Sequence, residues 1–113
     1  GLKLLAARFH DVNFVQMFDV TANFASVAIL PCDLTIQNMA MSNDERMVAT
    51  IDSHWNIRVW DVSMRRIVHL FWCPFSYHFV RSILYSATTS LRFSNDGKRL
   101  FASNMLCQWA YTL

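Results

Sequence analysis

The chain has 113 residues, of which 54% are apolar and only 16% are charged, and its formal net charge is +2. This composition excludes a disordered, acidic or coiled-coil protein and predicts one domain of ordinary size with a large apolar core. A net charge of +2 is too small to require a nucleic-acid or membrane partner by itself.

The cysteines are odd in number, widely spread and without a Cys-x-x-Cys pair: Cys32, Cys73 and Cys107. This pattern argues against a disulfide framework and favours a reducing compartment, so we expect the cytoplasm or the nucleus. The short apolar run near the N-terminus is broken at once by Arg8, His10 and Asp11. The sequence therefore predicts neither a signal peptide nor a membrane span.

Alternating apolar and polar residues predict short β-strands along the whole chain. The first three strands are expected at 4–9, 14–20 and 26–30. Four more are expected at 36–42, 47–52, 57–62 and 67–71, separated by the turn sequences SNDE, SHWN and SMRR. The last three are expected at 89–93, 99–103 and 106–111. No segment has a sustained helical period over ten residues, so we predict an all-β fold of antiparallel strands.

The sequence also repeats itself. A shift of 42 positions aligns the segment ending in Val20 with the segment ending in Val62 without a gap, so that Phe18 meets Trp60. A shift of 52 positions aligns SNDERMVA with SNDGKRLFA, after which three residues drop out and Trp109 falls under Trp60. Three copies of one unit are therefore predicted, two of them incomplete.

Four short strands per unit, with a Trp-Asp pair ending the third strand, resemble the WD-repeat blade of a β-propeller. The stretch MSNDERMVATIDSHWNIRVWDV carries the resemblance most fully, and LRFSNDGKRL resembles the first hairpin of a blade. The resemblance implies a partial propeller of four-stranded antiparallel blades. The residues that match the blade signature are Phe18, Asp19, Trp60, Asp61 and Trp109.

Under this resemblance, residues 1–30 are the last three strands of one blade, 36–71 a complete blade and 87–113 the first three strands of the next. Residues 72–86 form an aromatic-rich link between blades. A propeller closes with about 4–8 blades, so we expect residues 1–113 to be a fragment of one larger propeller domain. The alternative is a self-contained small β-sandwich with chance internal similarity.

The copies depart from the family's pattern at several positions. In that pattern an Asp in the turn before the third strand joins a hydrogen-bonded network with the Trp, but Val12 and His54 occupy that position here. No Gly-His dipeptide opens any copy, and Ala110 replaces the terminal Asp in the third copy.

Antiparallel strands place alternate turns at opposite rims of a blade. One rim is expected to collect the cations Arg46, Arg65, Arg66, Lys98 and Arg99. Because Asp44, Glu45 and Asp96 lie among them, these turns are either ordinary solvated turns or a small patch for phosphate, RNA or an acidic partner.

The opposite rim is expected to be aromatic. It holds Trp55 in a tight turn and, in the link, Trp72, Phe75 and Phe79. Exposed aromatic residues are costly, so we expect these residues to dock a partner chain or a neighbouring segment. The alternative is that the link folds back over its own blades.

Catalytic and metal sites have little support in the sequence. His69, Cys73 and His78 are spaced too loosely for an ordinary zinc site, and no phosphate-binding glycine loop, nucleophile elbow or His-Glu-x-x-His motif occurs. Asp19 and Asp61 are expected to fix turns. We therefore expect no enzyme activity, cofactor, metal or small-molecule substrate.

The function predicted from the sequence is a non-catalytic scaffold for protein-protein assembly within a multi-subunit complex. Its expected partners are other protein subunits and the rest of its own propeller. The alternative is an RNA-associated assembly factor, for example in ribosome biogenesis, that uses the basic rim.

Overall fold

Alternation of apolar and polar residues produces three antiparallel sheets in the computed structural model, which describes residues 4–8, 14–31, 36–52, 54–72, 90–103 and 108–113. The first sheet contains β1 (Leu4–Arg8), β2 (Phe14–Asp19) and β3 (Ala25–Pro31), with the 3₁₀ helix η1 (Val20–Ala22) between the last two. The middle sheet contains β4 (Ile36–Met41), β5 (Met47–Asp52), β6 (Asn56–Asp61) and β7 (Arg66–Trp72). The third sheet contains β8 (Ser90–Phe93), β9 (Arg99–Ser103) and β10 (Gln108–Thr112).

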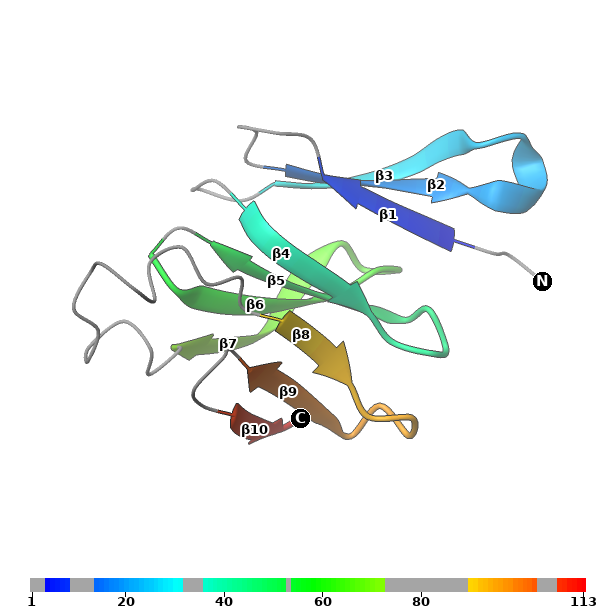
Figure 1. Cartoon of the computed structure of the whole chain (residues 1–113). Helices are drawn as coiled ribbons and strands as arrows, with labels where there is room; N and C mark the ends of the chain where they lie inside the picture. The colour runs from blue at the N-terminus through cyan, green and yellow to red at the C-terminus, as the bar shows by residue number, and fades with distance from the viewer. Residues whose placement is uncertain (1–3, 9–13, 32–35, 53, 73–89, 104–107) are drawn as a thin grey trace.

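Within each sheet, strands that follow one another in the chain also lie side by side, in the orders β1-β2-β3, β4-β5-β6-β7 and β8-β9-β10 (Figure 1). The predicted all-β, antiparallel fold is confirmed, and each expected strand lies within two residues of an observed one. No helix in these described ranges is long and apolar enough to cross a membrane.

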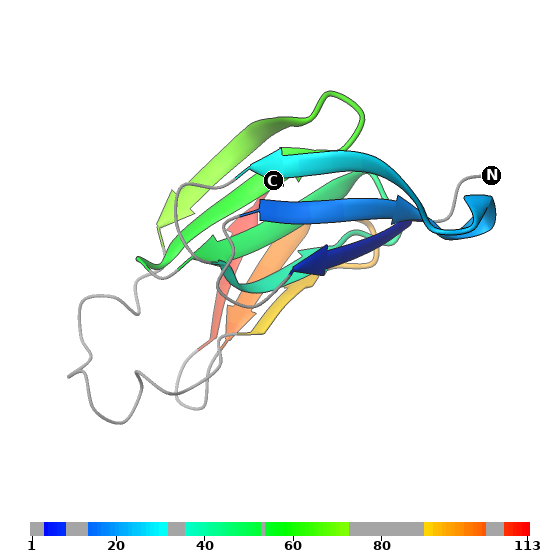
Figure 2. The ribbon, with the colours of Figure 1, turned by 90° about the horizontal axis from the view of Figure 1, so that it is seen from above.

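The three sheets stack face to face, with the middle sheet between the other two (Figure 1). Figure 2, which looks onto the first sheet, shows its strands crossing those of the middle sheet at an angle. The core between the first and middle sheets consists of Val15, Met17, Leu30, Ile36, Val48 and Trp60. The core between the middle and third sheets consists of Ala49, Ile51, Ile57, Val59, Leu91, Phe93, Leu100 and Ala102.

Strand β5 shows why the middle sheet needs both neighbours. Every residue from Val48 to Asp52 is buried, because successive side chains point to opposite faces and both faces are covered. Val48 packs toward the first sheet, and Ile51 packs toward the third. A strand that is buried on both faces has a nearly continuous apolar sequence, as the segment MVATI does.

The internal repeat is visible in the backbone. A register shift between Met17 and Phe18 in the β2–β3 pair recurs between Val59 and Trp60 in the β6–β7 pair, at the same positions of the repeat. Because β-bulges disrupt a ladder at defined positions, their recurrence indicates that the first and middle sheets are built alike.

The third copy aligns differently from the sequence-based expectation. In the middle sheet, Trp60 lies opposite Val48. Leu100 is the repeat equivalent of Val48 in the third sheet, and Tyr111 lies opposite it. Matching backbone bonds support this register, since Val62 N donates to Arg46 O at 2.9 Å and Leu113 N donates to Lys98 O at 2.9 Å. Tyr111 therefore occupies the position of Trp60, and the predicted equivalence of Trp109 with Trp60 is wrong by two residues.

Substitutions at two isoleucines test whether the stacked faces hold the fold together. Ile51 is fully buried against the third sheet, whereas Ile29 on β3 is 53% exposed. We expect Ile51→Ala to lower the free energy of unfolding by about 2–5 kcal/mol, because it leaves a cavity between two sheets. Ile29→Ala is the matched control and should change it by no more than about 0.5 kcal/mol. Urea denaturation measures both, and equal effects would contradict the stacked arrangement.

Candidate functional site

Two nearly identical turns connect β4 to β5 and β8 to β9. In the first, Ser42 Oγ donates to Asp44 Oδ1 at 2.7 Å, and Asp44 Oδ1 also accepts from Arg46 N at 3.0 Å. In the second, Ser94 Oγ donates to Asp96 Oδ1 at 2.7 Å, and Lys98 N donates to the same oxygen at 3.0 Å. The sequence Ser-Asn-Asp therefore fixes both turns through one local network.

The two turns also touch each other. Asn43 Nδ2 donates to Asn95 Oδ1 at 3.3 Å, which joins equivalent positions of the middle and third sheets. Each turn contains one left-handed residue, Glu45 at φ 61° and Gly97 at φ 73°. Glycine adopts this conformation without steric cost, so the second turn has the more favourable residue.

Asp19 and Asp61 fix the turns that follow the third strand of each unit. Asp19 Oδ1 accepts from Thr21 N at 2.9 Å and from Thr21 Oγ at 2.7 Å. Asp61 Oδ1 accepts from Met64 N at 2.9 Å and from Ser63 Oγ at 2.8 Å. Both carboxylates act on the backbone of their own turns. Phe18, beside Asp19, is partly exposed, whereas the equivalent Trp60 is buried.

The turns at one end of the three sheets carry the predicted cationic residues (right side of Figure 1). All five of these side chains are exposed: Arg46, Arg65, Arg66, Lys98 and Arg99. Four carboxylates share the same turns, namely Asp44, Glu45, Asp61 and Asp96, so five cations against four anions leave a net charge of only +1. This basic rim is therefore close to neutral as a whole.

A buried carboxylate that the sequence analysis did not single out organises the opposite end of the middle sheet. Asp52 is 1% exposed, and its Oδ1 accepts from His54 N at 2.8 Å and from Asn56 N at 3.0 Å. Its Oδ2 forms an ion pair with Arg58 Nη1 at 2.6 Å. The WD-repeat pattern has its turn aspartate at the position of His54. Here the carboxylate that fixes the turn belongs to Asp52, two residues earlier.

The network around Asp52 does not include Trp60. Within the described ranges, Trp60 Nε1 is buried and has no hydrogen-bond partner. The signal that could have identified Asp52 is an Asp at the start of a tight turn, where its side chain accepts backbone N–H groups two and four residues later.

Two of the predicted aromatic rim residues lie at this same end. Trp55 has φ 67°, which is unusual for a bulky residue, and its partly buried ring packs against the core between the middle and third sheets. Trp72 lies opposite Asn56, the residue next to Trp55, and is 46% exposed. Phe75 and Phe79 lie outside the described residues.

Among the side chains that the structure describes, those of β7 form the largest group of exposed large apolar residues on one strand. They are Ile67 at 42%, Val68 at 38%, Leu70 at 65% and Trp72 at 46%, and we refer to them as the β7 strip. β7 pairs with β6, and among the described residues no strand pairs with its other edge. The third sheet supports it from behind, since Phe71 stacks on Tyr111 with centroids 4.6 Å apart and Tyr111 Oη donates to Trp72 O at 3.3 Å.

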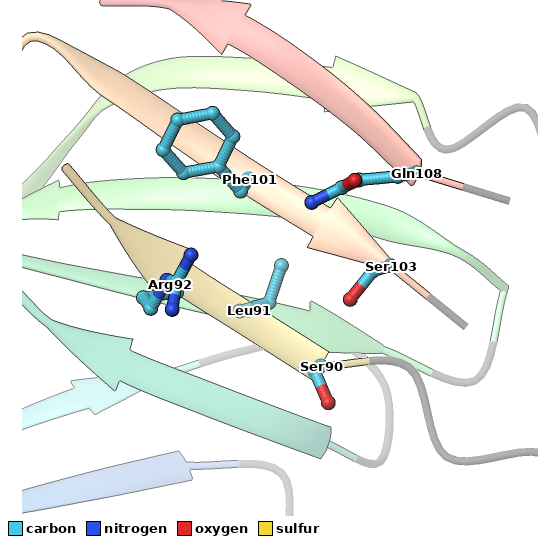
Figure 3. Close-up of a pocket in the computed structure, with 6 residues that line it drawn as sticks. All are labelled: Ser90, Leu91, Arg92, Phe101, Ser103 and Gln108. Atoms are coloured by element: carbon cyan, nitrogen blue, oxygen red, sulfur yellow. The ribbon is translucent and has the colours of Figure 1, made fainter. Parts of the chain in front are cut away.

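The outer face of the third sheet contains an open cavity of about 390 Å³ (Figure 3). The lining residues come from all three strands: Ser90, Leu91 and Arg92 from β8, Phe101 and Ser103 from β9, and Gln108 from β10. The Arg92 guanidinium carbon lies 5.9 Å from the centroid of the Phe101 ring, within the range of a cation–π contact.

No group of three or more His, Cys, Asp or Glu residues that could hold a metal ion occurs in the described part of the chain. The His69 ring stacks on Phe71, with centroids 5.6 Å apart. Cys73 and His78, the other members of the loose ligand set, lie outside the described residues.

Comparison of the chain with protein-family models and with curated proteins finds no match. What the structure establishes is an all-β protein of three small antiparallel sheets.

The lowered pKa values of three aspartates on the basic rim, Asp44, Asp61 and Asp96, predict how the stability of the protein depends on pH. Hydrogen bonds from Ser42 and Ser94 hold the pKa of Asp44 and of Asp96 below the ordinary value of 3.8, and the Met64 backbone N–H lowers the pKa of Asp61. A lowered pKa in the folded state stabilises the protein above the pKa of the unfolded chain, and this stability is lost as pH falls through the folded pKa.

Replacing Asp44, Asp61 and Asp96 together by Asn should therefore make the urea midpoint less dependent on pH between about pH 5 and pH 2. Wild-type protein measured in parallel is the reference. An unchanged slope in the triple variant would show that other carboxylates cause the acid sensitivity.

Proposed function

We propose that the protein is a non-catalytic scaffold for protein-protein assembly, built from consecutive blades of a β-propeller. The resemblance of the sequence to WD repeats supports this architecture, as do the equivalent bulges of the first and middle sheets. The twin turns that join the middle and third sheets support it further. A propeller packs such sheets face to face around a central channel, so that their loops and outer strands form rigid binding surfaces.

The β7 strip is the observation that carries the protein-binding function. Its four side chains form a run of exposed apolar surface on the last strand of the middle sheet. Exposed apolar patches on folded proteins mark interaction sites. Because β6 and Tyr111 already hold this strand, a partner would bind it with little ordering cost.

Trp72 is the expected anchor of this surface. Tryptophan is enriched among the few residues that supply most of the binding energy of an interface. Its backbone carbonyl is held by Tyr111, while 46% of the residue is exposed. The partner is therefore expected to be a protein that places an apolar groove or an extended apolar strand against β7.

RNA binding through the basic rim is the second candidate, supported by five exposed cations at one end of the sheets. The rim's net charge of +1 makes it the weaker candidate, because phosphate binding draws its affinity from the excess of cations. RNA binding would be strongly salt-dependent and would be lost on charge reversal at Arg65, Arg66, Lys98 and Arg99.

A photo-crosslinking residue at position 70 should capture the protein partner in cells, and Trp72→Ala should then weaken binding of the purified partner by about tenfold or more. Isothermal titration calorimetry measures the affinity. Ile29→Ala removes an equally exposed apolar side chain from a different sheet and should leave the affinity unchanged.

The result that would contradict the scaffold proposal is a partner whose binding is insensitive to Trp72→Ala. Crosslinks from position 70 to RNA only, with binding lost on rim charge reversal, would favour the RNA alternative.

A further inference from the structure

The internal repeat allows the middle and third sheets to be compared position by position, and their equivalent faces differ in polarity. Strand pairing places Ala40 opposite Ala49 in the middle sheet, and Arg92 opposite Phe101 at the equivalent position of the third. The face of the middle sheet that packs on the third sheet consists of Ala40, Ala49, Ile51, Ile57 and Val59. The equivalent positions of the third sheet hold Arg92, Phe101, Ser103, Gln108 and Ala110.

This difference indicates what the outer face of the third sheet can bind. A face of Ala, Ile and Val is suited to packing against another apolar sheet. A face with an exposed arginine, a serine and a glutamine would lose the hydration of these groups under an apolar cover, without hydrogen bonds in return. A group that covers the outer face of the third sheet would therefore have to supply polar partners.

The side chains of this face form two rows across the strands (Figure 3). In one row, Ser103 lies between Ser90 and Gln108. In the next, Phe101 lies between Arg92 and Ala110. The cavity of about 390 Å³ spans both rows and is large enough for an amino-acid-sized group.

Arg92 gives this face of the third sheet a positive charge. The sequences of β8, β9 and β10 contain no Asp or Glu, so no carboxylate within the third sheet's strands can pair with Arg92. The guanidinium carbon of Arg92 lies 5.9 Å from the centroid of the Phe101 ring, and both residues line the cavity. A guanidinium presents donors in a planar fork that fits a carboxylate, and the serines and Gln108 can hydrogen-bond a peptide backbone.

We propose that this face is a binding site for a protein segment that carries a carboxylate side chain, with Arg92 pairing the carboxylate and the Ser90–Ser103–Gln108 row contacting the backbone. The site does not rest on the β7 strip or on the proposed scaffold function. It lies on a different sheet and recognises the opposite kind of chemistry.

Titration of the ¹⁵N-labelled protein with N-acetyl-glutamate amide tests the proposal by nuclear magnetic resonance. The neutral isostere N-acetyl-glutamine amide is the ligand control. We expect saturable amide shifts concentrated at Ser90, Arg92 and Phe101 with the acidic compound, and at least about tenfold weaker binding of the neutral one, because a charge-assisted hydrogen bond is lost.

Two variants separate this site from the basic rim. Arg92→Gln should weaken binding of the acidic compound by at least about tenfold, whereas Arg65→Gln, which changes an exposed arginine in the turn between β6 and β7, should leave it unchanged. Equal binding of the two compounds, no effect of Arg92→Gln, absence of any saturable shift, or shifts centred on Arg65 and Arg66 would each overturn the proposal.

Discussion

The structure depends on covering both faces of the middle sheet. Strand β5 is buried from Val48 to Asp52, so neither face can meet water without exposing apolar side chains. The first sheet covers one face with Val15, Met17 and Leu30, and the third covers the other with Leu91, Phe93 and Leu100. The hydrophobic effect therefore holds the three sheets together, whereas hydrogen bonds within each turn fix the turns at their ends.

The candidate binding surfaces lie where this stacking stops. β7 extends beyond the covered part of the middle sheet, so its outer side chains are exposed although Phe71 is held by Tyr111. The outer face of the third sheet has polar residues where the middle sheet has apolar ones. The two surfaces therefore differ in chemistry, and the two proposed binding sites lie on different sheets.

Most of the fold could be predicted from the sequence because alternation and turn residues act locally. Ser-Asn-Asp recurs at Ser42 and Ser94, and both turns form the same hydrogen bonds.

The features that the sequence does not predict come from effects that act across strands. Residue type aligns Trp109 with Trp60, but backbone pairing sets the register and places Tyr111 at that position. The turn role of Asp52 follows from a local signal, but its burial and its ion pair with Arg58 depend on the neighbouring strand and sheet. The sequence does not predict the β7 strip either, because the sequence of an apolar strand does not indicate which of its sides remains exposed.

Amide hydrogen exchange measured residue by residue tests the central claim most directly. If the middle sheet is enclosed by its two neighbours, amides of β5 and β6 should exchange slowest in the molecule, and those of β1 and β10, at the sheet edges, should exchange much faster. The same protection in β1 and β10 as in β5, or faster exchange in β5, would contradict the account, because the middle sheet would then not be the enclosed element on which the others depend.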